Sequence, residues 1–569
     1  MQGPAITIAK ELGYYTIALD GSSAAPCTGM ADRFEQIDLK DKEGIENFAR
    51  SIQGETDRLG IMTAGTDFSA NVAWTAEKLG LPGIPYEAAL NASDKSRMRE
   101  CFKKACLPSP DFIIISKEDI HTETQRHRGH KDNFNELILK LKLPPFPVVV
   151  KPVDNMGSRG CRRVDSIEEF AEAAKTAIGF SRSGRAIVES YMDGPEFSVD
   201  AIVYHGEITI CGLADRHIFF PPYFIEMGHT MPTVIAKEKQ QDLLDTFRSG
   251  IYALGLSGRD SIGAAKGDIK LTSKGPMIGE IAARLSGGYM SGWTYPYSSG
   301  ALPIKGAILA AMGKNPEGLI PTKSWTCAER AFISIPGTVK EIVRSEELGV
   351  RSSESGVSSV ECGVRSSELT NFVNDIFMRI KEGDKVSFPE NNVTKCGNII
   401  ASAPDRESAV KAAEDAARMI LIRLDPSDME TKKFITGEPH TETQRHRGIF
   451  PPDAFTLTNE LQEALKQLPD PTPHSSLLTP HFSLTPFPAF ENSGLTDYMG
   501  RTVKESLKAV SLLCASVPLC ETLSDPPENA ENVVRLGRSF WAALIRGGYQ
   551  GAVYYIDSLG EKIDKEENR

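Results

Sequence analysis

The sequence predicts a multidomain protein of mixed α/β and α+β class. Helical and strand patterns alternate over residues 1–90, short strands with tight turns dominate residues 148–282, and helical patterns return over residues 491–569. A chain of 569 residues is long enough to bury several hydrophobic cores. The three patterns therefore predict separate domains rather than one continuous sheet.

The N-terminal domain, residues 1–90, is predicted to be a parallel α/β unit. Helical patterns cover GPAITIAKELG, ENFARSI and SANVAWTAEKLGL, while one strand is predicted to end at Asp20 and another to cover GIMTAGTD. A strand and a glycine turn normally precede the first helix of such a unit. Because the first helix begins at Gly3, we expect this sheet to lack its first strand.

Residues 262–291 contain a predicted hairpin with two acidic side chains. Its strands are expected to meet at a turn over residues 274–276, with Asp268 on the first strand and Glu280 on the second. Two neighbouring carboxylates repel each other unless a divalent cation lies between them. The pair therefore predicts a Mg²⁺ site, with Mn²⁺ as the alternative ion. Arg284 adds a guanidinium suited to a phosphoryl or carboxyl oxygen.

A second pattern favours phosphate binding. Lys151 ends a buried strand, FPVVVK, and the loop that follows contains Gly157 and Gly160. A lysine on a rigid strand supplies charge, and glycines leave backbone N–H groups unobstructed. The spacing differs from the nucleotide loop that ends in GK[ST] and from the GxGxxG fingerprint. We therefore predict a phosphate-binding flap between two strands. Lys95, in a basic helix, is by composition alone an ordinary exposed lysine.

Two further segments are candidate ligand contacts. Residues 189–192 end a strand and are expected to pass beneath a flat base, with Glu196 directed at a ribose or a lysine; an ordinary β-turn is the alternative. Glu226 and His229 are expected on a loop because prolines flank them, where an acid and an imidazole can hold an ammonium group or relay its proton. A packed structural histidine is the alternative reading.

These motifs, in this order, resemble the ATP-grasp superfamily over about residues 3–425. The matching text is DK at 94–95, FPVVVKP with GSRG, VESYMDGPEFSVD, and D…GEIAAR. Within the superfamily the chain looks most like carboxylate–amine ligases, including the L-amino-acid ligases, because it also carries YFIEMGHTMP. One departure is Ala282, which stands where the family pattern E-x-N-x-R often has asparagine.

The resemblance implies a role for each candidate residue. Lys95 and Lys151 would contact the ATP phosphates under the 157–160 loop, residues 189–192 would hold adenine, and Asp268 and Glu280 would hold the metal. Arg284 would stabilise an acyl phosphate, with Glu226 and His229 facing the substrate. The implied cofactor-binding residues are Lys95, Lys151, Gly157, Ser158, Arg159, Gly160, Glu189, Ser190, Tyr191, Met192 and Glu196.

The resemblance also predicts domain boundaries after residue 90. The ATP-grasp domain is expected at 91–320, with a nucleotide-closing subdomain at about 107–190. A lid like that of biotin carboxylase and carbamoyl-phosphate synthetase is expected at 321–425. Beyond the resemblance, proline-rich composition and then helical patterns predict a linker at 426–490 and a helical module of unknown role at 491–569.

Two low-complexity features fall inside these predicted parts. A serine-rich insert is expected at 345–370 within the lid, because such text cannot bury a core. The nonapeptide HTETQRHRG occurs at 121–129 and again at 440–448. We interpret both copies as exposed inserts rather than as a metal site.

Composition argues against several other classes of protein. The formal net charge of -12 gives no sign of a basic face for nucleic acid. No apolar run approaches the roughly 18 residues needed to span a bilayer, and the first residues lack a signal-peptide pattern. The 10 cysteines form no CxxC pair, so we expect a reducing, cytoplasmic environment.

We therefore expect an ATP-dependent ligase that joins a small carboxylate to an amine, with amino-acid-like substrates. Mg-ATP would phosphorylate the carboxylate, the amine would attack the acyl phosphate, and ADP and phosphate would leave. An ATP-grasp enzyme that makes carboxy-phosphate or acts on a sugar-phosphate amine is an alternative. A non-catalytic ATP-binding or assembly protein is another. A homodimer is left open.

Overall fold

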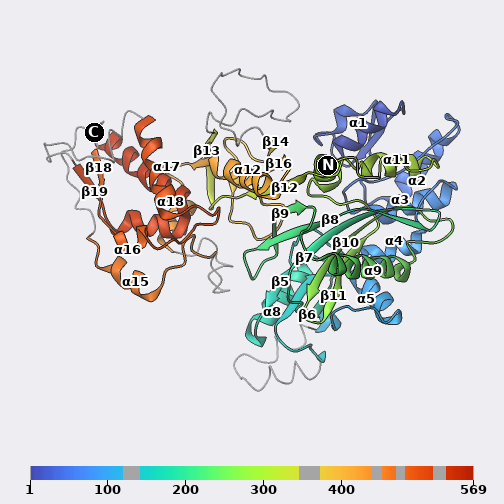
Figure 1. The fold of residues 1–569 in the computed structure, drawn as a ribbon, viewed down its shortest axis with the longest axis horizontal. Helices are drawn as coiled ribbons and strands as arrows, with labels where there is room; N and C mark the ends of the chain where they lie inside the picture. Colours follow the sequence, from blue (N-terminus) through green and yellow to red (C-terminus); the bar gives the residue numbers. More distant parts are fainter. Residues whose placement is uncertain are drawn as a thin grey trace. The chain divides into compact units, whose positions relative to one another are not determined.

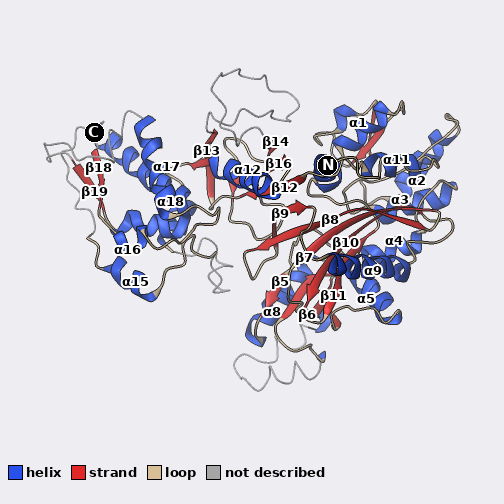
Figure 2. Ribbon diagram, viewed as in Figure 1, coloured by secondary structure: helices blue, strands red, loops and turns tan. Residues whose placement is uncertain are grey.

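The computed structural model describes residues 2–119, 141–344, 372–437, 451–469, 481–516 and 533–567 (Figures 1 and 2). The chain forms two compact units. The first unit comprises Met1–Arg330, Glu390–Asn392 and Ile400–Ala413, and the second comprises Ala331–Pro389, Val393–Ile399 and Glu414–Arg569. The predicted insert and both copies of HTETQRHRG lie outside the described residues.

The N-terminal part of the first unit is mainly helical. The predicted helices and the strand that ends at Asp20 are confirmed, and β1 pairs in parallel with β2. The predicted strand GIMTAGTD is wrong, because residues 60–67 form a loop. Its elements are α1 (Gly3–Glu11), β1 (Ile17–Asp20), β2 (Arg33–Gln36), α2 (Lys42–Gln53), α3 (Ser69–Leu79) and α4 (Tyr86–Ser93).

A four-stranded antiparallel sheet, in the order β3-β6-β4-β5, follows in the first unit. Helix α8 covers it with the apolar stripe of Phe170, Ala174 and Ala177, which packs on Val148 and Val150. The alternation of buried positions along VVVKP, residues 148–152, leaves Lys151 on the opposite face. Its elements are β3 (Phe112–Ser116), β4 (Val148–Pro152), β5 (Arg162–Val164), α8 (Ile167–Phe180) and β6 (Arg185–Ser190).

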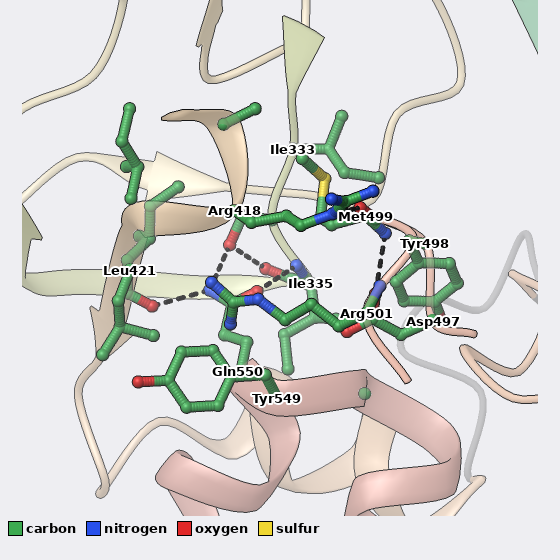
Figure 3. Close-up of a pocket in the computed structure, with 15 residues that line it drawn as sticks. Ile333, Ile335, Arg418, Leu421, Asp497, Tyr498, Met499, Arg501, Tyr549 and Gln550 are labelled. Carbon is green, nitrogen blue, oxygen red and sulfur yellow. Dashed lines mark hydrogen bonds between the residues drawn. The ribbon is translucent and has the colours of Figure 1, made fainter. Parts of the chain in front are cut away.

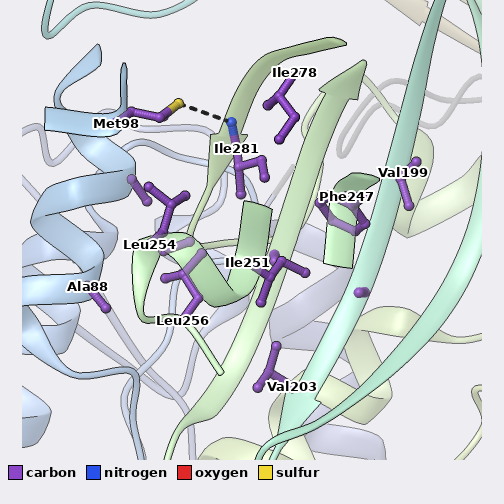
Figure 4. Close-up of a cluster of buried hydrophobic side chains, with 14 of the residues drawn as sticks. Ala88, Met98, Val199, Val203, Phe247, Ile251, Leu254, Leu256, Ile278 and Ile281 are labelled. Atoms are coloured by element: carbon purple, nitrogen blue, oxygen red, sulfur yellow. Dashed lines mark hydrogen bonds between the residues drawn. The ribbon is translucent and has the colours of Figure 1, made fainter. Parts of the chain in front are cut away.

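The larger sheet of the first unit has the order β11-β10-β7-β8-β9-β12, with antiparallel neighbours throughout. Helices α4, α5 and α9 cover one face, where Phe247 and Ile251 pack on Val199 and Ile281 (Figure 4). The strands and helices are α5 (Lys95–Lys104), β7 (Glu196–Tyr204), β8 (Glu207–Phe219), β9 (Ile225–Met231), α9 (Lys237–Leu254), β10 (Ile262–Thr272), β11 (Gly275–Ala282) and β12 (Thr326–Phe332).

The opposite face of this sheet is covered by α1 and α11. Ile202 and Ala264 point to that face and pack with Ile304 and Ile308, whereas their neighbours Val203 and Ala265 belong to the first core. Both faces of β7 and β10 are therefore buried, so these strands are nearly continuous apolar runs. The remaining helices are α10 (Tyr295–Ser298) and α11 (Pro303–Ala311), after a π-helical turn over Met290–Thr294.

The second unit combines a small sheet with a helical part built on aromatic packing. Its three-stranded sheet has the order β15-β13-β17. Its elements are β13 (Gly337–Arg344), β14 (Val373–Met378), β15 (Lys385–Val386), β17 (Ile420–Leu424), α13 (Met429–Thr436), α15 (Asn459–Lys466), β18 (His481–Leu484), α16 (Pro488–Glu491), α17 (Val503–Ser516), β19 (Val533–Leu536) and α18 (Arg538–Glu567). Three elements, β12, β16 (Gly397–Ala403) and α12 (Arg406–Met419), have residues in both units.

Residues far apart in sequence share the core of the second unit. Phe455, Phe487 and Phe490 pack with Phe540 and Trp541. The first three belong to the predicted linker, which therefore contributes to a hydrophobic core.

The predicted domain boundaries divide the chain more finely than the two units do, and they stay predictions. The predicted mixed α/β and α+β class is confirmed. None of the helices in the described ranges is both long and apolar enough to cross a membrane.

Replacing Phe247 tests the main core of the first unit. Phe247 is fully buried and packs so closely on β10 that a Cβ at Gly267 would lie 2.6 Å from its ring. Phe247→Ala should lower the unfolding free energy by about 3–5 kcal/mol, since it removes a large side chain and leaves a cavity. Tyr252→Ala, on the same helix but with 58% of its surface exposed, is the matched control. Equal urea-unfolding midpoints for the two variants would contradict this packing.

Candidate active site

The predicted carboxylate pair is confirmed in the hairpin of β10 and β11. Asp268 and Glu280 are directly opposite each other across the two strands. The turn lies over residues 273–274, slightly earlier than predicted, because Gly275 already pairs with Thr272. Asp268 is buried and Glu280 is half-buried. The strand register therefore holds both carboxyl groups on one side of the hairpin.

Each of these carboxylates has a lysine partner. Nζ of Lys95 lies 3.3 Å from Glu280 and donates to the carbonyl of Asn155 at 2.9 Å. Nζ of Lys266, two residues before Asp268 on the same face of β10, donates to the Asp268 carboxylate. Burial would raise the pKa of both acids, but the neighbouring cations keep the pKa of each below its ordinary value. Both groups are therefore anionic near neutral pH.

Arg216 on β8 joins three carboxylates. Its guanidinium is 2.9 Å from Glu226, 3.2 Å from Asp268 and in contact with Glu196. Burial would lower the pKa of Arg216, but Asp268, Glu196 and Glu226 together raise it well above its ordinary value. The Glu196 side chain, expected to reach a ribose or a lysine, is bound to this arginine.

Lys151 belongs to a buried ion cluster. Its Nζ is 2.8 Å from Glu189, whose other oxygen accepts from Nε of Arg99 at 2.8 Å. Burial would raise the pKa of Glu189, but Arg99 and Lys151 lower it to about 2. Arg99 also donates to the carbonyl of Gly279 at 2.7 Å, next to Glu280. The Glu189 side chain thus holds Lys151 in place.

The rest of the predicted base-binding segment follows β6. The carbonyl of Met192 accepts from Nζ of Lys270 at 3.1 Å, and the guanidinium of Arg163 lies 4.6 Å from the ring centre of Tyr191. The amide of Ser190 donates to the carbonyl of Asp111 at 2.9 Å. The segment is therefore anchored by its backbone and by two cationic side chains.

The predicted flap is a tightly turned loop between β4 and β5. Gly157, Ser158 and Gly160 all have left-handed backbones, with φ of 67°, 59° and 69°. Asn392 fixes this loop, because its backbone N–H donates to the Gly157 carbonyl at 3.0 Å and its side-chain Nδ2 donates to Ser158 Oγ at 3.2 Å. Arg159 turns back on the loop, with its Nε donating to the carbonyl of Met156 at 3.1 Å.

Glu226 and His229 lie on strand β9, so the predicted loop is wrong. Side chains three apart on a regular strand would point to opposite faces. The pairing of β8 with β9 shifts register between Glu226 and Gly228, which leaves Met227 as an extra residue. This bulge brings Nε2 of His229 within 3.8 Å of the Glu226 carboxylate. The flanking prolines suggested a loop, but they only precede and follow the strand.

His229 is held by a partner that sequence reasoning missed. Its Nδ1 lies 2.7 Å from the carboxylate of Glu329 on β12, and both side chains are buried. Gly228, with φ of 153°, permits this approach, because a Cβ there would lie 2.0 Å from the Glu329 carbonyl oxygen. The ring orientation is therefore fixed, with Nε2 toward Glu226.

Arg284 lies beyond the hairpin beside two acids from other segments. Its Nε is buried, 3.8 Å from the Asp67 carboxylate, and has no hydrogen-bond partner in the described part of the chain. Nearby, the Asp200 carboxylate accepts from the amide and hydroxyl of Ser286. Burial raises the pKa of Asp200 to about 6, although Ser286, Lys266 and Arg284 act in the opposite direction.

Several of these residues were absent from the sequence predictions. Lys266 could have been found, because it lies two positions from Asp268 and strand alternation places both on one face. The others carry no local signal, since each acts through a partner on another element. The missed residues are Asp67, Arg99, Asp200, Arg216, Lys266 and Glu329.

The hairpin acids are of the chemical type that binds a divalent cation, but they do not form a complete ligand set. Carboxylate oxygens are the ligands that Mg²⁺ prefers, usually with water and substrate phosphates completing the shell. Within the described ranges, no group of three or more His, Cys, Asp or Glu is arranged to hold a metal. Ala282, opposite Lys266, supplies no ligand atom. As ligands of such an ion, Asp268 and Glu280 would need phosphate or water oxygens beside them to complete the shell.

Comparison with known families agrees with this geometry. Residues 144–291 match a family model described as ATP-grasp domain. The chain carries an ATP-grasp domain. Residues 358–425 match a second model, L-amino acid ligase C-terminal domain 2. The ATP-grasp match spans β4 to β11 and so includes Lys151, the flap and the acidic hairpin.

Known proteins similar to this chain include ligases. Carnosine synthase 1 of Gallus gallus is 22% identical over 325 residues, 54% of this chain and 33% of that protein. D-alanine–D-alanine ligase of Pseudomonas putida (strain GB-1) is 24% identical over 265 residues, 44% of this chain and 77% of that protein. The crystal structure of an L-amino acid ligase from Bacillus licheniformis gives a TM-score of 0.58 and 19% identity over 74% of this chain and 96% of that chain.

These similarities support the ATP-grasp domain and its fold. The structural match shows the fold alone at this level of identity. The chain spans 54% and 33% of the lengths of the first two curated relatives that it matches. The functions that these names give are therefore functions of those relatives.

The raised pKa of Asp200 predicts a pH dependence of stability. Its folded-state pKa of about 6 exceeds the ordinary 3.8, so the folded protein holds this proton more tightly than the unfolded chain. The stabilisation is fully present below about pH 4 and is lost as the pH rises through about 6, a loss of about 3 kcal/mol. The unfolding free energy of wild type relative to Asp200→Asn should therefore fall over this range. Asp242→Asn, at an exposed position, is the control, and a flat difference for Asp200→Asn would contradict the assignment.

Proposed function

We propose that this protein is an ATP-dependent ligase that joins a small carboxylate to an amine through an acyl phosphate. The observation that carries the proposal is the pairing of Asp268 with Glu280 inside an ATP-grasp domain, with Lys95 and Lys266 on the two acids. Phosphoryl transfer needs little covalent help from a protein. It depends on alignment and on neutralisation of charge, which such a cluster can supply.

The names of similar proteins favour amino-acid-like substrates. The printed names are D-alanine–D-alanine ligase, carnosine synthase and L-amino acid ligase. The proposed substrates are therefore a small carboxylate and an amine, at least one of them an amino acid. The acids and cations around Glu226, Arg216 and Arg284 suit zwitterionic ligands, because each charged end of such a ligand needs a partner of opposite sign.

Each proposed step uses groups of this chain. Lys95 and Lys151 bind phosphate oxygens, and the 157–160 loop covers them and excludes water from the acyl phosphate. Asp268 and Glu280 would hold a divalent ion, proposed to be Mg²⁺ with Mn²⁺ as the alternative, which supplies charge neutralisation at the phosphates. The substrate carboxylate attacks the γ-phosphorus, and the bond to ADP breaks. Arg284 stabilises the acyl phosphate that results.

The second half of the reaction needs an acceptor for a proton. The amine attacks the acyl carbon, the carbon–oxygen bond to phosphate breaks, and the nitrogen loses a proton. Glu226 and Nε2 of His229, 3.8 Å apart, are the proposed acceptors. Glu329 holds Nδ1 and so keeps Nε2 directed toward Glu226.

Turnover tests the proposal most directly. Purified protein with Mg-ATP should release ADP only when a suitable carboxylate is present, and the rate should rise with a particular amine. The measurement is a coupled ADP assay over amino acids offered singly and in pairs, with bicarbonate and sugar-phosphate amines as separate arms. Stimulation by bicarbonate alone would favour the carboxy-phosphate alternative. ATP binding without turnover in any arm would favour a non-catalytic ATP-binding protein.

Replacing Glu280 tests the metal assignment. Glu280→Gln should lower Mg²⁺-dependent turnover by at least about a hundredfold. The neutral amide lacks the negative charge that is proposed to bind the metal and that pairs with Lys95. Direct titration of Mn²⁺ by electron paramagnetic resonance, in the presence of ADP, should show weaker binding. Glu207→Gln, at an exposed position on β8, is the matched control. Unaltered Mn²⁺ binding would remove Glu280 from the metal site.

Replacing Lys151 tests the phosphate contact. Lys151→Met should weaken ADP binding by roughly tenfold or more, since it deletes a buried positive charge proposed to meet a phosphate. Lys274→Met, in the exposed hairpin turn, should leave the affinity unchanged. The measurement is calorimetric titration with ADP. Equal affinities for the two variants would exclude a contact between Lys151 and the nucleotide.

A further inference from the structure

The second unit contains a small cavity, lined by both polar and apolar groups, that the proposed reaction does not use. It has a volume of about 50 Å³, more than the roughly 10–15 Å³ that one water needs. Its lining comes from β17, the end of α12, residues 497–501 and the middle of α18 (Figure 3). The cavity therefore lies where C-terminal residues pack against the small sheet within one unit.

Most polar groups of this lining have protein partners. Gln550 donates to Ser334 at 2.7 Å and to the carbonyl of Ile422 at 2.8 Å, and its oxygen accepts from the amide of Ile335. Arg418 donates to the Met499 carbonyl at 3.0 Å and to Asp415 at 2.8 Å. These side chains line the cavity, but their main hydrogen bonds are made to other groups of the protein.

The guanidinium of Arg501 differs from these groups. It lies 4.3 Å from the ring centre of Tyr549. Among the residues that the structure describes, Arg501 donates through its backbone amide, to Asp497, and its side-chain nitrogens have no hydrogen bond or ion pair. The nearest acid in the lining, Asp497, accepts from the backbone amides of Met499 and Arg501 instead. A guanidinium has five N–H donors in a fixed plane, and the donors of the half-buried Arg501 side chain that meet no protein acceptor can meet a ligand.

The backbone around Arg501 is adapted to this arrangement. Gly500 has φ of 75°, and a Cβ there would lie 3.0 Å from the guanidinium of Arg418. Gly548 has φ of 62°, which kinks α18, and a Cβ there would lie 3.0 Å from the Asp497 carboxylate. The two glycines thus bring Arg418, Asp497 and Arg501 to the same small space.

We propose that this cavity binds a small oxyanion, a carboxylate or a phosphate, with Arg501 as its main contact. The Arg501 plane matches the two oxygens of a carboxylate or two oxygens of a phosphate, and the Tyr549 ring holds that plane in position. Arg418 adds a second positive charge, and Asp497 sets a limit on how much negative charge the site accepts. The site is separate from the ATP-grasp domain and does not depend on the proposed ligase reaction.

Calorimetric titration of the full chain tests the proposal, with inorganic phosphate and acetate as separate probes. Arg501→Gln should weaken binding of the preferred probe by at least about tenfold, and Arg501→Lys should lose less because it keeps the charge. Lys381→Gln, at an exposed position of the same unit, should bind that probe as wild type does. A preference for phosphate or for acetate identifies the source of the oxyanion.

A second measurement needs no variant and covers the case in which Arg501→Gln fails to fold. An arginine-specific dicarbonyl reagent, mapped by mass spectrometry, should modify Arg501 of wild type several-fold more slowly when the preferred probe is present. The rate at Arg163 serves as the internal control. Absence of binding by both probes, equal binding by Arg501→Gln, or an Arg501 modification rate that neither probe changes would overturn the proposal.

Discussion

The ion network of Arg216 is the constraint on which the candidate site depends. Glu196, Glu226 and Asp268 come from three different strands, and one guanidinium contacts all of them. Three carboxylates this close repel each other strongly at low dielectric. Because Arg216 lies on the central strand β8, a single side chain both joins the strands and offsets the negative charge of the three acids. The positions of Glu226, proposed to face the substrate, and of Asp268, proposed to bind the metal, are thus determined together.

The sequence allowed the local parts of this site to be predicted, because their signal is periodic. Alternating apolar residues on both sides of a Gly-Pro pair were enough to place Asp268 opposite Glu280. The turned loop of the flap could also be predicted, because its glycines at 157 and 160 favour left-handed backbone. The same reasoning gave most of the helices and the strand before Lys151. Patterns of period two or 3.6 therefore carried these predictions.

Features that depend on partners distant in sequence could not be predicted. The bulge at Met227 changes which face Glu226 occupies, and it is visible only in the pairing of β8 with β9. Glu329 contacts His229 from the neighbouring strand, because Gly228 leaves room for the close approach. No local sequence pattern indicates this contact. The loop at 60–67 contains an apolar stretch, but it finds no neighbouring strand in the described part of the chain. Tertiary context decided each of these cases.

Asn392 has a consequence for how the candidate site moves. Its amide and side-chain nitrogen hold residues 157 and 158, and its Oδ1 accepts from the amide of Glu226 at 2.7 Å. One asparagine therefore connects the loop expected over the phosphates to the strand of Glu226, the acid proposed to meet the second substrate. Any displacement of the loop must either break these hydrogen bonds or shift β9 with it. The two halves of the proposed reaction are in this way mechanically coupled, so that access to one ligand depends on the position of the groups that meet the other.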